Sequence, residues 1–463
     1  MNFLVIDQGT SSTKAFLFNK NGRTLFKDKI KHQLQRPKAL HVESDPKLIL
    51  NAIKTLVRRM VQLSNNTTIL QAGLAVQRST FLFWEKETCK PVTPAISWQD
   101  SRSYSIVEEK KRLKQKLWEK TGTPLSPHFG GPKFLYLLRQ NKTLAKRIKN
   151  GELYFGPLSA YLTHAITGNP YIDESIACRS LFYNIKKGTW SNFALDVFEV
   201  PLHALPQLTT VQYHYGSLFH TKIPLSIVIG DQQAALIGYA GLKKGTAGAN
   251  FGTSGSIQYN VGHMPVKAKG LISSVLFSNK EKYYMVEGTI NACNAIFYYL
   301  EGHLGIPHSE MKWDKRVLTS STKGILVPGF IGLAAPYWTR GFHNIYIDLN
   351  NNPNQIIRAG MESIGFLAND ILNCYKRVSG KNLNTLMVAG GASKSPLLQF
   401  ISDVTSIEIC KLSLKDRTAM GVYKLLKGNV ETDLRNVIET KFTPKQNINI
   451  KKKKWREALK QVI

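Results

Sequence analysis

The segment that most constrains the fold is Phe3 to Lys14, FLVIDQGTSSTK, close to the start of the chain. A short apolar run ends abruptly in an acid, a glycine and small polar residues, which predicts a buried strand that leads into a tight turn. In such a turn, backbone N–H groups can surround an anion. Taken alone, the segment fits a phosphate-binding turn and the start of an ordinary β-hairpin equally well.

If the turn binds phosphate, its side chains have separable roles. Thr10, Ser11 and Ser12 supply hydroxyl groups and Lys14 supplies positive charge. Asp7 could orient a magnesium ion through water, since Mg²⁺ keeps several waters when it binds nucleotide phosphates.

Apolar runs that end in small-residue turns recur later in the chain. A helix N-terminus with glycines can approach the phosphates of a nucleotide. Several such turns, with acids at Asp7 and Asp231, predict a duplicated structure with a cleft between its halves. The later runs and turns are Leu225–Ile229 before Gly230-Asp231-Gln232-Gln233, Ala249–Ser256 (ANFGTSGS), and Leu386–Ala389 before Gly390-Gly391-Ala392-Ser393-Lys394-Ser395.

The chain length predicts more than one domain. A chain of 463 residues is too long for one ordinary core, and typical domains of roughly 100–200 residues indicate two or three units. The mixed polar and proline-containing segment Pro201–Pro224 looks like the crossover. We therefore predict domains at 1–224 and 225–463.

The first half shows clear local patterns. Strands are expected at 14–19 and 24–31, joined by a turn at Asn21-Gly22. A helix should begin at Pro46, capped by Ser44 or Asp45. The charged stretch 103–120 predicts one helix closed by Gly122, with a solvated face.

The formal charge of +31 raises the question of a nucleic-acid partner. The lysines are spread along the chain, however, and only Lys451–Lys454 form a block. No nucleic-acid-binding module accompanies the charge, which favours a solvated basic surface over a specific nucleic-acid site.

The remaining bulk features indicate a cytoplasmic protein without membrane insertion. No run approaches transmembrane length, and Asp7 interrupts the only apolar stretch near the N-terminus. The cysteines are odd in number, scattered and not in metal-ligand spacing, so we expect reduced core thiols. They are Cys89, Cys178, Cys293, Cys374 and Cys410.

Taken together, these motifs resemble the FGGY carbohydrate kinases, within them the glycerol kinase branch, over nearly the whole chain. The segments that carry the resemblance are IDQGTSSTK, HVESDP, AVQRSTFLFWEKETCKPVTPAISWQ, IGDQQAALIG, NFGTSG, GLAAPYW and AGGASKSP. The resemblance implies a two-lobed α/β fold of the actin-like ATPase, ribonuclease H-like type. It would be a duplicated domain with central mixed sheets and flanking helices.

The resemblance also implies a reaction and its residues. ATP and Mg²⁺ would bind mostly on the second lobe, and a small sugar or polyol would bind in the cleft. Asp231 would remove the proton of the substrate hydroxyl, and Asp7 would hold the metal. The implied phosphate and nucleotide contacts are Thr10, Ser11, Ser12, Lys14, Thr253, Gly390 and Gly391, and the implied substrate contacts are Arg78, Trp98, Asp231 and Gln232.

The substrate side departs from the glycerol kinase pattern at two positions. Ser79 stands where a glutamate is expected, and His128 stands where a tyrosine is expected. Because Ser79 is a shorter acceptor, we hypothesise a substrate larger than glycerol, such as a four- or five-carbon polyol or ketose. A pentulose kinase of the xylulose or ribulose type remains an alternative.

The nucleotide side departs as well. Lys14 replaces an arginine, which keeps the charge but loses the bidentate fork. Asn294 and Tyr298 replace a glycine and a glutamine, and Ser395 replaces an asparagine. A non-catalytic member of the same fold and a chaperone or filament ATPase are the competing classes. A homodimer is compatible with each of these interpretations.

Overall fold

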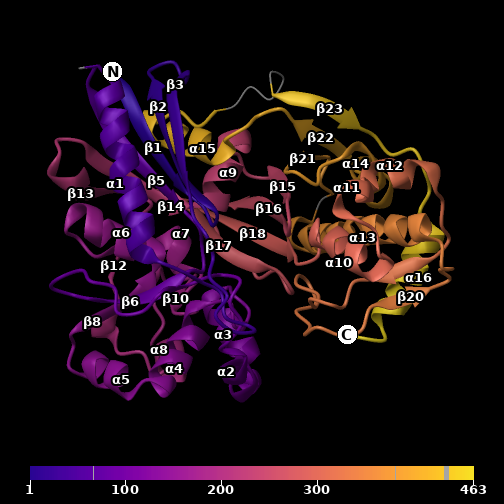
Figure 1. Cartoon of the computed structure of the whole chain (residues 1–463), viewed down its shortest axis with the longest axis horizontal. Helices are drawn as coiled ribbons and strands as arrows, with labels where there is room; N and C mark the ends of the chain where they lie inside the picture. The colour runs from indigo at the N-terminus through magenta and orange to yellow at the C-terminus, as the bar shows by residue number, and fades with distance from the viewer. Residues whose placement is uncertain (66, 381, 432–436) are drawn as a thin grey trace.

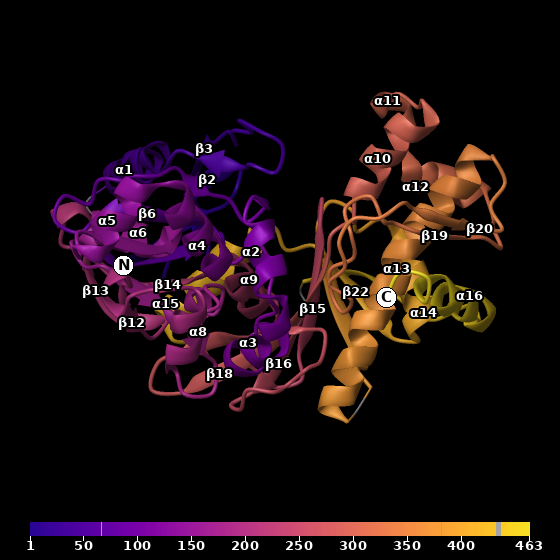
Figure 2. The ribbon, with the colours of Figure 1, turned by 90° about the horizontal axis from the view of Figure 1, so that it is seen from below.

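The computed structural model describes residues 1–65, 67–380, 382–431 and 437–463. The chain forms two lobes that lie side by side, each built around a twisted mixed sheet (Figure 1). Figure 2 shows strands β15 (Ala247–Phe251) and β16 (Gly255–Gly262) between the first lobe and the helices of the second. The α/β fold predicted from the sequence is confirmed.

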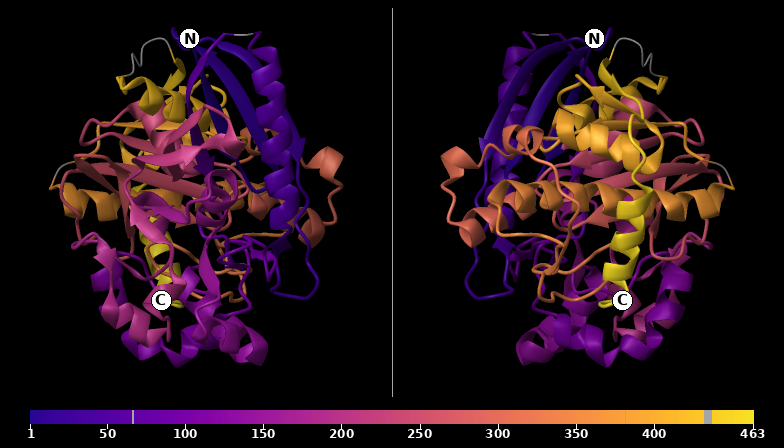
Figure 3. Two further views of the ribbon diagram at one scale, coloured as in Figure 1. Left: turned by 90° about the vertical axis from the view of Figure 1, so that its left-hand side faces the viewer. Right: turned by 90° about the vertical axis from the view of Figure 1, so that its right-hand side faces the viewer.

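The first sheet has the strand order β13-β14-β5-β1-β2-β3. Strands β1, β5 and β14 run parallel, while β2, β3 and β13 are antiparallel to their neighbours. Helix α1 (Pro46–Leu63) lies along β2 and β3 (Figure 3) and is capped by Asp45, as expected. The strand bounds are β1 (Asn2–Gln8), β2 (Ser12–Asn19), β3 (Thr24–Lys31), β5 (Ile69–Val76), β13 (Gln212–Ser217) and β14 (Pro224–Gly230).

The second sheet repeats this plan with one additional strand. Its order is β17-β18-β16-β15-β21-β22-β23, in which β15, β21 and β22 are parallel and the others antiparallel. Counted outward from β1 and β15, the two sheets agree in order and direction, which confirms the predicted duplication. The further strand bounds are β17 (Ile272–Ser278), β18 (Lys282–Ile290), β21 (Thr385–Ala389), β22 (Glu408–Leu412) and β23 (Ile438–Phe442).

The predicted boundary between residues 224 and 225 falls inside the first sheet. Strand β14 pairs with β5 and is followed at once by α9 (Asp231–Ala240), so the first sheet carries Asp231. Helix α15 (Arg417–Lys427), from the end of the chain, packs against α9 and also against β1 and β5. Glycines allow this contact, because a Cβ at Gly421 would lie 1.9 Å from the Ala234 carbonyl oxygen. The residue pattern of an apolar strand does not depend on which sheet the strand joins. The sequence alone therefore placed the domain boundary before β14 instead of after it.

The prediction of a single helix over residues 103–120 is wrong. The chain forms α2 (Tyr104–Glu109), a 3₁₀ turn (Lys111–Leu113) and α3 (Lys114–Thr121). Ile106 and Leu117 are the buried anchors of the two short helices. The residues between these anchors are exposed or half-buried, so no continuous buried face supports a single helix across both pieces.

A small antiparallel sheet and several helices complete the first lobe. The bounds are β4 (Glu43–Ser44), β6 (Phe81–Glu85), β7 (Ala95–Ile96), β8 (Leu153–Pro157), β9 (Tyr171–Asp173), β10 (Tyr183–Asn184), β11 (Thr189–Trp190), β12 (Gln207–Thr209), α4 (Gly130–Gln140), α5 (Lys142–Lys149), α6 (Leu158–Thr167), α7 (Glu174–Ala177) and α8 (Asn192–Val197). The second lobe adds α10 (Ala295–Leu304), α11 (His308–Met311), α12 (Trp313–Arg316), α13 (Pro353–Ser379), α14 (Ser395–Thr405), α16 (Asn449–Leu459), β19 (Ile325–Val327) and β20 (Ile345–Ile347).

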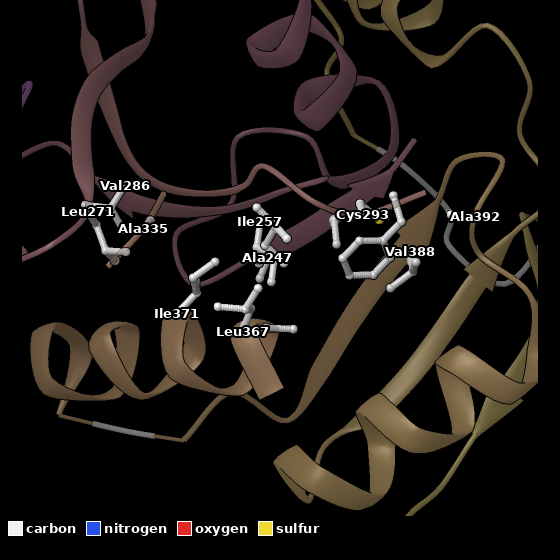
Figure 4. Packing of buried hydrophobic residues seen from close by; sticks show 14 of the residues in the cluster. Ala247, Ile257, Leu271, Val286, Cys293, Ala335, Leu367, Ile371, Val388 and Ala392 are labelled. Carbon is white, nitrogen blue, oxygen red and sulfur yellow. The ribbon is translucent and has the colours of Figure 1, made fainter. Parts of the chain in front are cut away.

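The core of the second lobe forms where α13 crosses the sheet. Leu367 and Ile371 of this helix point toward Ile257 and Val286 of the strands (Figure 4). Gly288 lets the helix approach, since a Cβ there would lie 2.5 Å from Ile371. All the cysteines are unpaired, and all except the half-buried Cys89 are buried. Among the described residues, no helix combines the length and apolar character needed to span a membrane.

Candidate active site

Asp7 and Asp231 lie at the same edge of the first sheet. The register pairs Val76, the last residue of β5, with Gln8 on one side and with Gly230 on the other. Asp7 precedes Gln8 and Asp231 follows Gly230, so the two acids flank the carboxyl end of β5. This is the edge at which parallel sheets present ligand-binding residues.

The carboxylate of Asp7 sits in an unusually crowded electrostatic environment. Burial, with smaller contributions from Asp231 and Asp416, raises its pKa to about 6 against the opposing charge of Lys14. The Lys14 Nζ lies 3.7 Å from Asp7 Oδ2 and 3.6 Å from Asp416 Oδ1. The positive charge of Lys14 is therefore shared between two carboxylates.

Asp231 is the first residue of α9 and is held by neighbours on both sides. Its Oδ1 accepts a hydrogen bond of 2.8 Å from the Gln232 backbone N–H and lies 3.6 Å from Arg78 Nε. Burial raises the pKa of Asp231, and the charge of Arg78 opposes the shift. Gly230 makes room for this arrangement, because a Cβ there would lie 2.9 Å from Arg78 Cδ.

Arg78 also joins the two lobes. Its Nη1 and Nη2 each donate a 2.7 Å hydrogen bond to Glu287 on β18, and Arg179 donates to the same carboxylate. Burial raises the pKa of Glu287, but the two guanidinium groups together outweigh it and lower that pKa to about 2. Because Glu287 is fully buried, the bidentate pair fixes the Arg78 head group beside Asp231.

Thr10 connects the first turn to the predicted substrate side. Its hydroxyl accepts a 2.9 Å hydrogen bond from Trp98 Nε1 and donates one of 3.2 Å to Gln77 Oε1. The turn itself is closed by the Gly9 N–H, which donates to the Ser12 carbonyl at 3.0 Å, while Ser11 is exposed. Thr10 was expected on the nucleotide side, and the structure joins it to Trp98.

His128 presents a hydrogen-bond acceptor. Its Nδ1 lies 2.9 Å from the Trp98 carbonyl oxygen, which can only accept, so Nδ1 carries the proton. Burial and the charge of Lys133 lower the pKa of His128 to about 4, which leaves the ring neutral and Nε2 unprotonated.

Lys133 holds the backbone of the same region in place. This buried side chain donates to the carbonyl oxygens of Ser79 at 2.8 Å and Ser97 at 2.7 Å. Burial lowers its pKa to about 7. Ser79 itself has a φ of 62°, in the left-handed region, so Lys133 secures a backbone conformation that a serine seldom adopts.

Backbone hydrogen bonds connect the turns of the second lobe to one another. The Gly252 and Thr253 carbonyls accept 3.0 Å hydrogen bonds from the Asn294 and Ala295 N–H groups, and Ala392 N–H donates to Phe251 at 2.9 Å. Gly390, with a φ of 112°, packs so closely that a Cβ would lie 2.2 Å from the Phe251 oxygen. A Cβ at Gly391 would meet nothing within 4 Å, so this backbone is open to a ligand.

The remaining predicted residues lie around these turns. Tyr298 is 47% exposed, one helical turn beyond Asn294, with its ring 5.8 Å from that of His308. Ser395 is the exposed first residue of α14. Gln232 reaches the second lobe, where its Oε1 accepts from Ser256 at 3.4 Å.

Four charged residues of the site were missed from the sequence, namely Lys133, Arg179, Glu287 and Asp416. Lys133 and Glu287 each interrupt an apolar run, GGPKFLYLL and YYMVEGTI, and a charge inside such a run is the signal that could have identified them. Asp416 lies in the turn that joins β22 to α15. The duplicated strand order is the signal for Asp416, because it makes this turn the counterpart of the turn after β14.

The donor set around Asp7 fits a magnesium ion held mainly by water and phosphate. Among the described residues, no trio of acidic, histidine or cysteine side chains could enclose a metal ion. Mg²⁺ commonly takes one or two carboxylates and completes its shell with water and substrate phosphates. Asp7, a single carboxylate beside an open turn, meets that requirement.

Family models match both halves of the chain. The N-terminal domain of the FGGY family of carbohydrate kinases matches residues 2–238, and the C-terminal domain matches residues 247–426. The first match ends in α9, in agreement with the sheet order rather than with the boundary predicted at 224.

Curated relatives and solved structures agree with this match. The chain is 30% identical to glycerol kinase 1 of Thermotoga maritima over 100% of both chains, and 31% identical to the glycerol kinase of Aeromonas hydrophila over 99% of this chain and 97% of that one. The structure of Plasmodium falciparum glycerol kinase with ADP superposes with a TM-score of 0.88 at 26% identity, covering 100% and 98% of the two chains. A xylulose kinase from Lactobacillus acidophilus has a TM-score of 0.86 at 19% identity, with 99% and 96% covered, and shows the fold alone.

Proposed function

The chain belongs to the FGGY family of carbohydrate kinases, enzymes that transfer phosphate to an alcohol group, and we propose that Asp231 is its general base and that its acceptor is larger than glycerol. The phosphoryl donor would be ATP, bound in the cleft between the lobes. The observation that carries the proposal is the juxtaposition of Asp231 with Asp7 and Arg78 at one sheet edge.

In this mechanism the acceptor hydroxyl binds against Asp231. Its oxygen forms the new bond to the γ-phosphorus while the bond to the β-phosphate oxygen breaks and ADP leaves. The hydroxyl proton passes to Asp231, whose raised pKa makes it a better base than an ordinary aspartate. Arg78, fixed by Glu287, would orient both the base and the acceptor.

The nucleotide would lie over the turns of the second lobe. The open backbone at Gly391 and the Thr253 turn would contact it, and a glycerol kinase of the same fold binds ADP. Mg²⁺ held through water by Asp7 would neutralise charge on the β- and γ-phosphates. Asn294, next to the Thr253 turn, is proposed to contact the nucleotide, with Tyr298 and Ser395 at the edge of the same surface.

The proposal of a larger acceptor rests on Ser79 and His128. The unprotonated Nε2 of His128 can accept a hydrogen bond from a substrate hydroxyl, and Ser79 occupies less space than a longer acid would. Trp98, anchored to Thr10, would form an apolar wall for the carbon chain.

A coupled ADP-release screen over polyols and ketoses of three to seven carbons tests this function. We expect turnover to be fastest with a four- or five-carbon acceptor. Glycerol itself is the second candidate, because the curated relatives are glycerol kinases. Fastest turnover with glycerol would refute the larger acceptor while leaving the kinase assignment intact.

A further inference from the structure

The duplication gives Asp231 and Asp7 counterparts in the second lobe. Asn250 is the second-last residue of β15, as Asp7 is of β1, and each is followed by a residue and then Gly-Thr. Arg417 is the first residue of α15 after β22, as Asp231 is the first residue of α9 after β14. The paired acids at one site therefore correspond to an asparagine and an arginine at the other.

The structure brings Arg417 and Asn250 into contact. Arg417 Nη2 donates a 3.0 Å hydrogen bond to Asn250 Oδ1, and the guanidinium carbon lies 5.8 Å from the centre of the Tyr239 ring. A Cβ at Gly390 would lie 2.8 Å from the same Asn250 oxygen. Arg417 thus stands directly behind the two glycine turns that offer backbone to a nucleotide.

Among the residues that the structure describes, no carboxylate pairs with the positive charge of Arg417. Its Nη1 is buried and finds no hydrogen-bond partner among the described residues. Burial lowers the pKa of Arg417, and the opposing influence comes from the Tyr239 hydroxyl, not from a carboxylate. Asp416, next to it in sequence, pairs with Lys14 and Lys27 instead. Arg417 as a whole is half-buried, and burying one nitrogen of a cation without a partner costs free energy unless an anion completes its hydrogen bonds.

Lys14, the other cation of the site, is already shared between Asp7 and Asp416. Two carboxylates therefore offset the positive charge of Lys14 where a polyphosphate would bind. At Arg417, no carboxylate of the described residues offsets the charge of the guanidinium group. An arginine can hold phosphate oxygens with two parallel hydrogen bonds, and a single neutral acceptor leaves the head group free to turn toward them.

We propose that Arg417 binds the phosphate groups of the nucleotide from the second lobe. The inference rests on the proposed function and deepens it, because it names the residue that recognises the polyphosphate. Arg417 would balance charge on the donor side of the cleft, where its hydrogen bond to Asn250 holds it in position.

Binding of ATP, ADP and adenosine to Arg417→Met, measured by calorimetry, tests the inference. Losing a charged, bidentate contact should weaken ATP and ADP binding by about 10- to 100-fold and leave adenosine binding unchanged. Arg456→Met removes an exposed arginine of α16 and is the matched control, which should bind all three ligands as the wild type does. If Arg417→Met does not fold, Arg417→Gln, which retains a donor for Asn250, carries the same comparison.

The outcomes separate this inference from the function on which it rests. ATP binding that is unchanged in the variant, or an equal loss for ATP and adenosine, overturns the role of Arg417 alone. A wild-type protein that binds no ATP overturns the proposed function and this inference together. ATP binding without phosphorylation of any acceptor refutes the function but leaves the Arg417 contact standing.

Discussion

Lys14 faces Asp7 across strands β1 and β2, with Nζ 3.7 Å from Oδ2, yet the pKa of Asp7 is raised to about 6. An isolated ion pair would lower that pKa. Burial is the largest influence, and the neighbouring Asp231 and Asp416 act in the same direction. The first turn therefore holds a carboxylate that is unfavourable for folding, which is typical of a residue retained for function.

Asp7→Asn should make the protein more stable at pH 8. The folded-state pKa lies above the ordinary value, so the stability that Asp7 contributes is complete below about pH 4 and is lost as the pH rises through 6. An uncharged asparagine avoids this loss, and we expect a gain of roughly 1–3 kcal/mol in the free energy of unfolding at pH 8.

Urea unfolding of the variant and the wild type at pH 8 and pH 5 measures this difference. The gain should shrink at pH 5, and kinase activity should fall at both values. Asp196→Asn, at an exposed position, provides the control and should show neither effect. An Asp7→Asn protein that is less stable at pH 8 would show that Lys14 outweighs burial.

Asp231→Asn should abolish most of the phosphoryl transfer while sparing nucleotide binding. A positioned general base contributes on the order of 10²–10⁴-fold to the rate, so kcat should fall by about that factor. Asparagine keeps the size and the hydrogen bond to the Gln232 N–H, which limits structural damage. Single-turnover transfer from labelled ATP measures the step directly, and an unchanged rate would assign the base to another residue.

The strand-and-turn pattern predicted a duplicated structure with a cleft, because apolar strands that end in acidic or glycine turns recur along the chain. The fold class itself came from the resemblance to the FGGY carbohydrate kinases, and the strand order confirms both. The pattern could not identify the sheet to which β14 belongs. That depends on hydrogen bonds to β5, far away in sequence, and on the packing of α15 against α9.

The site could be predicted only where its residues stand in turns. Lys133, Glu287 and Arg179 are buried charges whose partners come from other elements. A charge inside an apolar run indicates burial, but the sequence does not show which residue it pairs with. Thr10 shows the same limit of sequence-based prediction, because its hydrogen bond to Trp98 joins residues that are 88 positions apart.

Lys133→Met should flatten the dependence of stability on pH. The pKa of Lys133 is lowered from 10.5 to about 7, so the buried charge destabilises the wild type at acidic pH. The free energy of unfolding of the wild type should rise as the pH increases from 7 toward 10. Methionine fills the space without titrating. It also releases the carbonyl groups of Ser79 and Ser97, so the acceptor KM should rise by roughly tenfold, because each net hydrogen bond contributes about 1 kcal/mol.

Thermal melts between pH 6.5 and 9.5 and acceptor saturation curves test the two effects of Lys133→Met. The KM for ATP is the internal control, since Lys133 contacts the substrate side. A rise in both KM values would indicate general loosening of the lobes instead of a local effect on Ser79.

The double variant Ser79→Glu/His128→Tyr should shift preference toward glycerol. A glutamate restores a charged acceptor for a substrate hydroxyl, and a tyrosine fills the space in front of the Trp98 carbonyl that His128 now contacts. A site that forms a hydrogen bond to each hydroxyl of its substrate discriminates between substrates by a larger factor than an apolar wall does. The ratio of kcat/KM for glycerol to that for the best wild-type acceptor should increase by at least roughly tenfold, the equivalent of about 1.4 kcal/mol.

Ser79→Ala is the control for this variant, because it removes the hydroxyl without adding a carboxylate, and it should leave the ratio near its wild-type value. Each single substitution should move the ratio part of the way, and a double-mutant cycle measures whether the two positions act on the same hydroxyl. If the double variant keeps the wild-type preference while folding and binding ATP normally, then acceptor size is decided elsewhere in the cleft. Trp98 and Gln232 are the next residues to exchange in that case, since Trp98 is hydrogen-bonded to Thr10 of the first turn and Gln232 reaches Ser256 of the second lobe.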